Sequence, residues 1–181
     1  MKSGRWPTVS MALMLVPCLV HAALEVPVGY RRIAAEYAIP PQIFYAVALT
    51  ESGKQIESLA ALRPWPWTLN IAGTPTFFAH RDTAERALVR ALKSGEVLID
   101  IGVMQVNWRY HGTTLGSPRR ALEPYHNLRI AAKILSECYR ARANWWQAVG
   151  CYHAPGNAVH AARYQARVHQ HWQRIRPVDA S

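Results

Sequence analysis

A single carboxylate ends an otherwise apolar run in the first third of the chain. Glu51 follows residues 43–50, which are almost all apolar or aromatic, and Gly53 stands two positions later. The pattern predicts a largely buried helix with one acid at its C-terminal end. Burial raises the pKa of a carboxyl group, which suits an acid that donates a proton near neutral pH. The alternative is an ordinary helix-end glutamate whose head group reaches water.

Three later segments combine polar residues with small or apolar ones at fixed spacings. Residues 101–108 have the sequence IGVMQVNW, residues 127–135 have NLRIAAKIL, and residues 148–157 have AVGCYHAPGN, with Tyr164 following. The apolar spacing within residues 127–135 is that of a helix packed on a core. The glycine, amide and phenol side chains of the other segments are candidates for contacts with a polar ligand.

In this order, Glu51-Ser52 and the three segments resemble the catalytic domain of the soluble-lytic-transglycosylase type, the family 1 lytic transglycosylases. The family order is E-S, G-L-M-Q, N-[LI]-x-x-[AG]-A-x-[IY]-L and A-Y-N-A-G. The resemblance covers residues 34–168 and implies a lysozyme-like fold. The G-x-M-Q element, the cysteine before Tyr152 and a hairpin-like insertion are similar to members encoded with conjugative or type IV secretion systems.

The resemblance implies cleavage of the β-1,4 bond between N-acetylmuramic acid and N-acetylglucosamine in peptidoglycan, with a 1,6-anhydro sugar as product. Glu51 would protonate the glycosidic oxygen and then accept the proton of the C6 hydroxyl group that attacks C1. Most glycosidases use two carboxylates, but the 2-acetamido group of the substrate can replace the second. Asp100 stands in no matching motif, and we expect it in a surface or turn role. No cofactor is implied.

The matched positions imply a set of substrate-binding residues, which are Ser52, Gly102, Met104, Gln105, Asn107, Tyr152 and Tyr164. We expect Ser52 to hydrogen-bond near the acid or the acetamido group, and Tyr152 to point its hydroxyl group at the acid or the sugar. Gly102 would allow the backbone to approach the sugar, and Met104 and Gln105 would line the cleft. The alternatives are a solvent-facing hydroxyl group for Ser52 and core positions for Met104 and Tyr152.

The chain departs from the family pattern after Tyr152, where His153 replaces an asparagine and Pro155 replaces a glycine or follows a one-residue deletion. These changes leave the geometry of that loop open. The histidines suggest no metal site, because no H-E-x-x-H occurs and we expect His169 and His171 on a basic helix to be solvated.

Around these residues the pattern predicts a mainly helical, lysozyme-like α+β domain with a small β-hairpin insertion. The expected helices are residues 28–38, 41–51, 82–94, 122–143, 144–154 and 157–175. Residues 65–78 are typical of a hairpin with a glycine turn, and residues 97–101 of a short strand. Asp82 and Glu85 suggest a capping box, and residues 103–108 a helical turn. The long segment between Ser52 and Gly102 is expected to form a β-containing lobe or lid beside the cleft.

The N-terminal residues predict export. Lys2 and Arg5 precede an apolar stretch over residues 9–20, and Val20-His21-Ala22 suits a signal peptidase. We therefore expect a signal peptide over residues 1–22, one domain over residues 23–176, a flexible tail over residues 177–181, and a periplasmic location. The alternative is an uncleaved N-terminal anchor. No other segment is apolar over a membrane-spanning length, so we expect no integral membrane protein.

Charge and cysteine content agree with a cell-wall substrate. The net charge of +10 suits an anionic polymer, and export together with the lack of a nucleic-acid motif disfavours nucleic acid. A generically basic protein is the alternative. Cys138 and Cys151 remain beyond the leader, and an oxidising compartment favours a disulfide between them over two free thiols.

Three functions therefore stay open. The first is the transglycosylase, acting on glycan strands and opening the wall for a secretion or conjugation apparatus. The second is a hydrolysing muramidase on the same scaffold. The third is a non-catalytic peptidoglycan-binding scaffold subunit of such an apparatus.

Overall fold

The computed structural model describes residues 24–59 and 61–177. The predicted signal peptide and most of the predicted tail lie outside these residues. The helices are α1 (Val28–Glu36), α2 (Pro41–Ser52), α3 (Arg81–Lys93), α4 (Trp108–Leu115), α5 (Pro118–Ala121), α6 (Pro124–Arg142), α7 (Trp145–His153) and α8 (Ala158–Trp172), with the 3-10 turn η1 (Glu57–Leu59). The strands are β1 (Gly53–Ile56), β2 (Ala61–Pro64), β3 (Thr68–Ile71), β4 (Thr74–Phe77), β5 (Ile99–Ile101) and β6 (Val106–Asn107).

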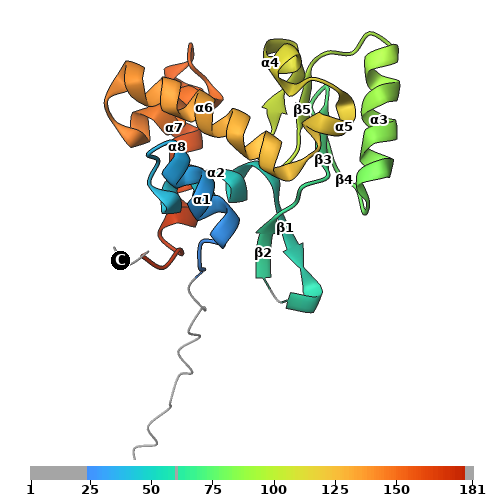
Figure 1. The fold of residues 1–181 in the computed structure, drawn as a ribbon. Helices are drawn as coiled ribbons and strands as arrows, with labels where there is room; N and C mark the ends of the chain where they lie inside the picture. The colour runs from blue at the N-terminus through green and yellow to red at the C-terminus, as the bar shows by residue number, and fades with distance from the viewer. Residues whose placement is uncertain (1–23, 60, 178–181) are drawn as a thin grey trace, which may run out of the picture.

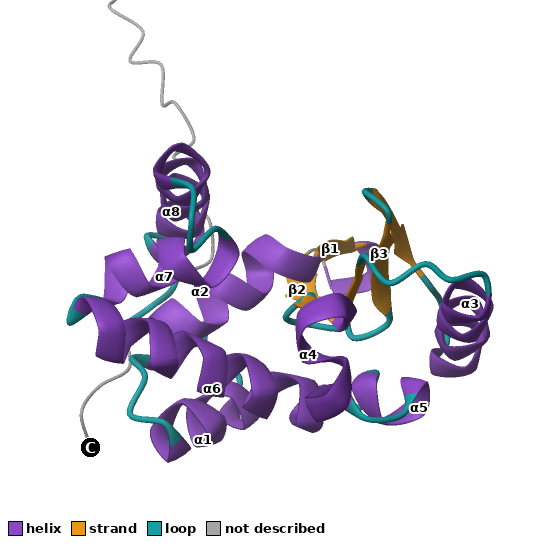
Figure 2. Ribbon diagram, turned by 90° about the horizontal axis from the view of Figure 1, so that it is seen from above, coloured by secondary structure: helices purple, strands orange, loops and turns teal. Residues whose placement is uncertain are grey.

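The elements form two lobes (Figure 1). The helical lobe contains α1, α2, α6, α7 and α8, and the β lobe contains the sheet β4-β3-β5-β6 with α3, α4 and α5. The hairpin of β1 and β2 extends away from both lobes. Figure 2 shows the same division from above, with α6 running from the helical lobe toward α4 and α5. The predicted class, mainly helical α+β and lysozyme-like, is confirmed.

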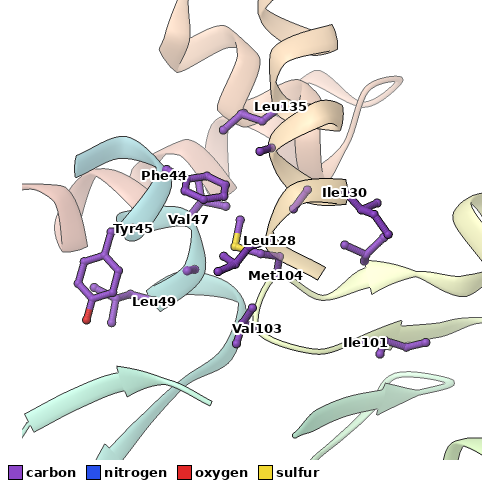
Figure 3. Close-up of a cluster of buried hydrophobic side chains, with 14 of the residues drawn as sticks. Phe44, Tyr45, Val47, Leu49, Ile101, Val103, Met104, Leu128, Ile130 and Leu135 are labelled. Carbon is purple, nitrogen blue, oxygen red and sulfur yellow. The ribbon is translucent and has the colours of Figure 1, made fainter. Parts of the chain in front are cut away.

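Helix α2 is the centre of the helical lobe because its sequence is apolar on every side. Residues 43–49 are all buried, and a helix that is apolar all round is stable only inside a core. Pro41 occupies its first turn, where a missing N–H costs nothing. Figure 3 shows Phe44 and Val47 of α2 facing Leu128 and Leu135 of α6. This packing fixes the direction in which α2 points its last residues.

The sheet of the β lobe contains the predicted hairpin. Strands β3 and β4 pair antiparallel, and Gly73 has φ +85° in the turn between them, a conformation that glycine adopts without strain. Strand β5 pairs with β3 on one side and with β6 on the other. Ile99 and Ile101 of β5 are fully buried, so the sheet packs one face on the core and leaves the other available.

Two local predictions were wrong. Residues 103–108 do not begin a helix: after a turn they form β6, and α4 begins only at Trp108. Asn107 caps α4 by accepting a hydrogen bond from the Arg109 N–H group at 3.0 Å. The capping box at Asp82 is absent, because α3 starts one residue earlier and His80 is its N-cap residue. The sequence predicted a β-containing lobe between Ser52 and Gly102, but it did not predict β1 and β2 as a separate hairpin.

Candidate active site

Glu51 lies in the last turn of α2, at a cleft of about 710 Å³. The cleft is lined by both lobes, through α2, α6, α7 and α8 on one side and β3, β5, β6 and α4 on the other. The pKa of Glu51 is raised from its usual 4.5 to about 7, mainly by burial and to a smaller extent by the nearby charge of Asp100. A hydrogen bond from Tyr164 and the charge of Arg167 act in the opposite direction. The carboxyl group is therefore poised to exchange protons near neutral pH.

Two tyrosines surround the acid, and their roles differ from those expected. The Tyr164 hydroxyl group of α8 donates a hydrogen bond to Glu51 Oε1 at 2.5 Å. The Tyr152 hydroxyl group of α7 does not reach Glu51 but donates to the backbone carbonyl oxygen of Met104 at 2.7 Å. Burial raises the pKa of both phenols well above 10, so both remain donors. Tyr164 is thus the direct partner of the acid, and Tyr152 joins α7 to the turn before β6.

Three of the expected binding residues, Ser52, Gly102 and Met104, are buried and serve the structure of the cleft floor. Met104 is fully buried and lies in the core cluster of Figure 3, because its apolar side chain gains more there than in a wet cleft. The Ser52 hydroxyl group is also buried and donates to the Val103 carbonyl oxygen at 2.7 Å. It faces neither substrate nor solvent, and it ties the end of α2 to the turn over residues 102–105.

The backbone at Gly102 packs against the side chain of Asn127. The φ angle of Gly102 is +80°, and a Cβ atom there would lie 2.8 Å from the Asn127 amide. Asn127 of α6 is buried; its amide group donates to Ile101 O at 2.9 Å, and its Oδ1 accepts from Met104 N at 3.0 Å. Asn127, the first residue of the segment 127–135, therefore holds the turn at Gly102 in the segment 101–108.

Gln105 and Asn107, both expected at the site, line the cleft. Gln105 Nε2 donates to Gly102 O at 2.9 Å and to Thr68 O at 3.2 Å, which fixes its side chain against the sheet. Asn107 Nδ2 donates to Asp100 Oδ1 at 2.7 Å. The two amides stand on the β-lobe wall opposite the acid-bearing helix.

Asp100 was expected in a surface or turn role, and that prediction was wrong. It is the central residue of β5 and lines the cleft with Asn70 of β3 and Arg167 of α8, which no motif indicated. The alternation Ile99-Asp100-Ile101 carried a usable signal, since two buried isoleucines turn the residue between them to the other face of the sheet. The same alternation holds for Asn70 between Leu69 and Ile71.

The loop after α7 completes the helical wall of the cleft. The predicted disulfide between Cys138 and Cys151 is present, joins α6 to α7, and lines the cleft. His153, one of the departures from the family pattern, stacks on the Tyr164 ring with centroids 4.3 Å apart, and Pro155 also lines the cleft. His153 therefore places an imidazole ring against Tyr164, whose hydroxyl group binds Glu51.

Two further features concern ligands and membranes. Within residues 24–59 and 61–177, no group of three or more histidine, cysteine or acidic side chains could hold a metal ion. Among the helices that the structure describes, none is long and apolar enough to cross a membrane.

A helical lobe and a small β lobe that meet at a cleft, with one acid at the end of the central helix, define a lysozyme-like domain. Residues 30–175 match the family model described as Transglycosylase SLT domain, and the chain belongs to this family. Membership indicates peptidoglycan as the substrate, lytic activity of the transglycosylase type, and action in the periplasm or outside the cell. No curated protein and no solved structure matches the chain.

Proposed function

We propose that the protein is an exported, periplasmic lytic transglycosylase in which Glu51 serves first as acid and then as base. The protonated carboxyl group donates its proton to the oxygen between N-acetylmuramic acid and N-acetylglucosamine as the bond from C1 to that oxygen breaks. The resulting carboxylate accepts the proton of the C6 hydroxyl group while the C6 oxygen bonds to C1. The product is a 1,6-anhydro sugar, and no water is consumed.

The observation that supports this proposal is the setting of Glu51. A carboxyl group with a pKa of about 7 is half protonated near neutral pH, so it donates a proton readily and accepts one in the next step. The hydrogen bond from Tyr164 fixes the orientation of the carboxyl group at 2.5 Å. The same contact stabilises the carboxylate that forms after the first proton transfer.

Other cleft residues suit the binding of an N-acetylated sugar. Gln105 and Asn107 present amides on the β-lobe wall, and the opposite wall presents His153 and the disulfide. Most of the side chains that line the cleft are polar, so they can hydrogen-bond the hydroxyl and amide groups of a sugar and orient it before reaction. The 2-acetamido group of the substrate would help to stabilise the positive charge at C1.

Glu51→Gln is the decisive substitution. It keeps the shape of the side chain and removes its proton exchange, so we expect release of soluble muropeptides from sacculi to fall about 10²- to 10⁴-fold. Glu25→Gln is the matched control, because Glu25 is an exposed acid that precedes α1. This variant should retain full activity. Mass analysis of the wild-type products should show anhydro-muropeptides, lighter by one water than hydrolysed ones.

The other candidate functions predict different results. Products that retain the water indicate a muramidase, and sedimentation with sacculi without release of soluble products indicates a scaffold subunit. The expectation that the enzyme opens the wall for a conjugation or secretion apparatus is carried only by the sequence resemblance. Reduced transfer after deletion of the gene, with normal growth, would support it.

A further inference from the structure

Asp100 lies at the centre of a polar ladder that crosses three strands. In the sheet register it is opposite Asn70 of β3 on one side and Asn107 of β6 on the other. Residues directly opposite one another on neighbouring strands project from the same face. All three line the cleft, whereas Ile99 and Ile101, before and after Asp100, are fully buried on the core face. The sheet thus presents this carboxyl group toward the helix that carries Glu51.

Both oxygens of Asp100 are held by amide donors. Asn70 Nδ2 donates to Oδ2 at 3.0 Å, and Asn107 Nδ2 donates to Oδ1 at 2.7 Å. An ionised carboxylate accepts both bonds without a proton of its own. Within the described ranges no lysine or arginine forms an ion pair with Asp100. A half-buried carboxyl group, held in place by two amides and without a lysine or arginine at ion-pair distance among the described residues, therefore faces the cleft.

The charge of Asp100 acts on the groups around the reaction. It raises the pKa of Glu51, after the larger effect of burial, and it also raises that of Tyr152. Glu51 and Asp100 thus differ in environment, since one lies at the end of an apolar helix and the other is hydrogen-bonded on a sheet. Two carboxyl groups in such different environments can divide the work of an acid and of a permanent charge.

We propose that Asp100 is a second catalytic carboxylate, whose negative charge stabilises the positive charge that develops at C1 of the N-acetylmuramic acid ring. The inference rests on the proposed function and deepens it. Glu51 carries both proton transfers, while Asp100 forms no bond and exchanges no proton. Its field is strongest in the transition state, because the substrate has no positive charge at C1 before the glycosidic bond begins to break.

The central experiment is Asp100→Asn, which removes the charge and keeps the shape. We expect kcat on purified glycan strands to fall about 10²- to 10³-fold with little change in KM. Asp100→Ser, which is smaller and also neutral, should lose a similar factor, and Asp100→Glu should recover part of it. Asp82→Asn, at an acid whose side chain is 72% exposed on α3, is the matched control and should leave kcat unchanged.

The pH profile separates a catalytic charge from a merely structural one. The groups that shift the pKa of Glu51 are Asp100 from β5 and Tyr164 and Arg167 from α8. Tyr152 and His153 of α7 are further titratable groups of the same cleft. Neutralising Asp100 lowers the pKa of Glu51, so activity should be lost at a lower pH as the pH rises. Arg167→Gln removes a charge that lowers the same pKa, so it should shift the loss to a higher pH.

The outcomes of the two sets of variants are distinguishable. If Glu51→Gln is inactive but Asp100→Asn and Asp100→Ser keep the wild-type kcat and pH profile, the role of Asp100 is wrong and the proposed function stands. A loss confined to KM would also overturn it, since it would indicate sugar binding alone. If Glu51→Gln remains active, both proposals fail. Thermal melting of each variant shows whether the chain is folded.

Discussion

At the scale of single residues, the pKa of the half-buried Glu51 depends on opposing influences. Burial at the end of α2 disfavours the carboxylate, while the Tyr164 hydroxyl group favours it through a bond of 2.5 Å. A carboxyl group that was only buried, without this hydrogen bond, would hold its proton too tightly to act as a general acid. The phenol keeps the pKa near 7, where both proton transfers are within reach.

Tyr164→Phe tests this balance. The substitution removes a hydrogen bond that lowers the pKa of Glu51, so that pKa should rise. The loss of kcat/KM at high pH should then move to a higher pH, by roughly one unit. Tyr152→Phe is the matched control, because its hydroxyl group donates to Met104 O instead. Equal shifts in the two variants would show that the hydrogen bond to Glu51 has no special role.

The residues that the sequence could identify are those whose chemistry follows from local context. Glu51 could be identified because it ends an apolar helix and because the three later motifs follow it in the family order. Asp100 could not, because its place opposite Glu51 depends on the register of β5 between β3 and β6, which no local pattern contains. Met104 was misplaced because its motif position suggested the cleft, whereas packing against α2 and α6 decides where a methionine lies.

At the scale of elements, the cleft floor is a turn held between two helices. Gly102 and Gln105 both have positive φ, at +80° and +47°. Asn127 of α6 bonds to both sides of this turn, and Ser52 of α2 donates to its Val103 carbonyl oxygen. The second, third and first sequence motifs are therefore one structural unit, although they are far apart along the chain.

Gly102→Ala should destabilise this unit. A Cβ atom would lie 2.8 Å from the Asn127 amide, and alanine is strained at positive φ. We expect the free energy of unfolding to fall by about 2–4 kcal/mol in urea titrations. Gly95→Ala is the matched control, with φ +85° and no atom within 4 Å of the added methyl group, so it should cost only about 1–2 kcal/mol. Equal losses would show that the contact with Asn127 contributes nothing.

The helices were predictable and their ends were less so. Periodicity located α2, α6, α7 and α8 to within a few residues, because burial of an apolar stripe decides where a helix lies. Residues 103–108 were predicted to start a helical turn. The hydrogen bond from Met104 N to Asn127 and the pairing of β6 with β5 fix a turn and a strand there instead.

At the scale of the whole molecule, two lobes divide the site. The helical lobe supplies the proton donor and its phenol, and the β lobe supplies Asp100 with its two amides. A glycan strand lying in the cleft between them would meet a proton donor on one wall and a negative charge on the other. The charged residues that line this cleft are Glu51, Asp100 and Arg167, so the excess of basic side chains in the described part of the chain lies outside it and suits adhesion to the anionic cell wall.

Stability should also record the cost of the buried acid. Because the folded-state pKa of Glu51, about 7, exceeds its usual 4.5, the folded chain binds more protons than the unfolded chain between these values. The contribution of this group is therefore fully present below pH 4.5 and is lost as the pH rises to about 7 and just above it. The loss should be at most about 3 kcal/mol, because the cleft leaves the carboxyl group partly solvated. Glu51→Gln has no such titration. Chemical denaturation from pH 4 to pH 8 should therefore show the free energy of unfolding of the variant rising relative to that of the wild type. If the difference in unfolding free energy between the two proteins stays constant with pH, Glu51 ionises as easily in the folded chain as in the unfolded one. Its pKa would then not be raised, and the residue could not serve as both acid and base near neutral pH.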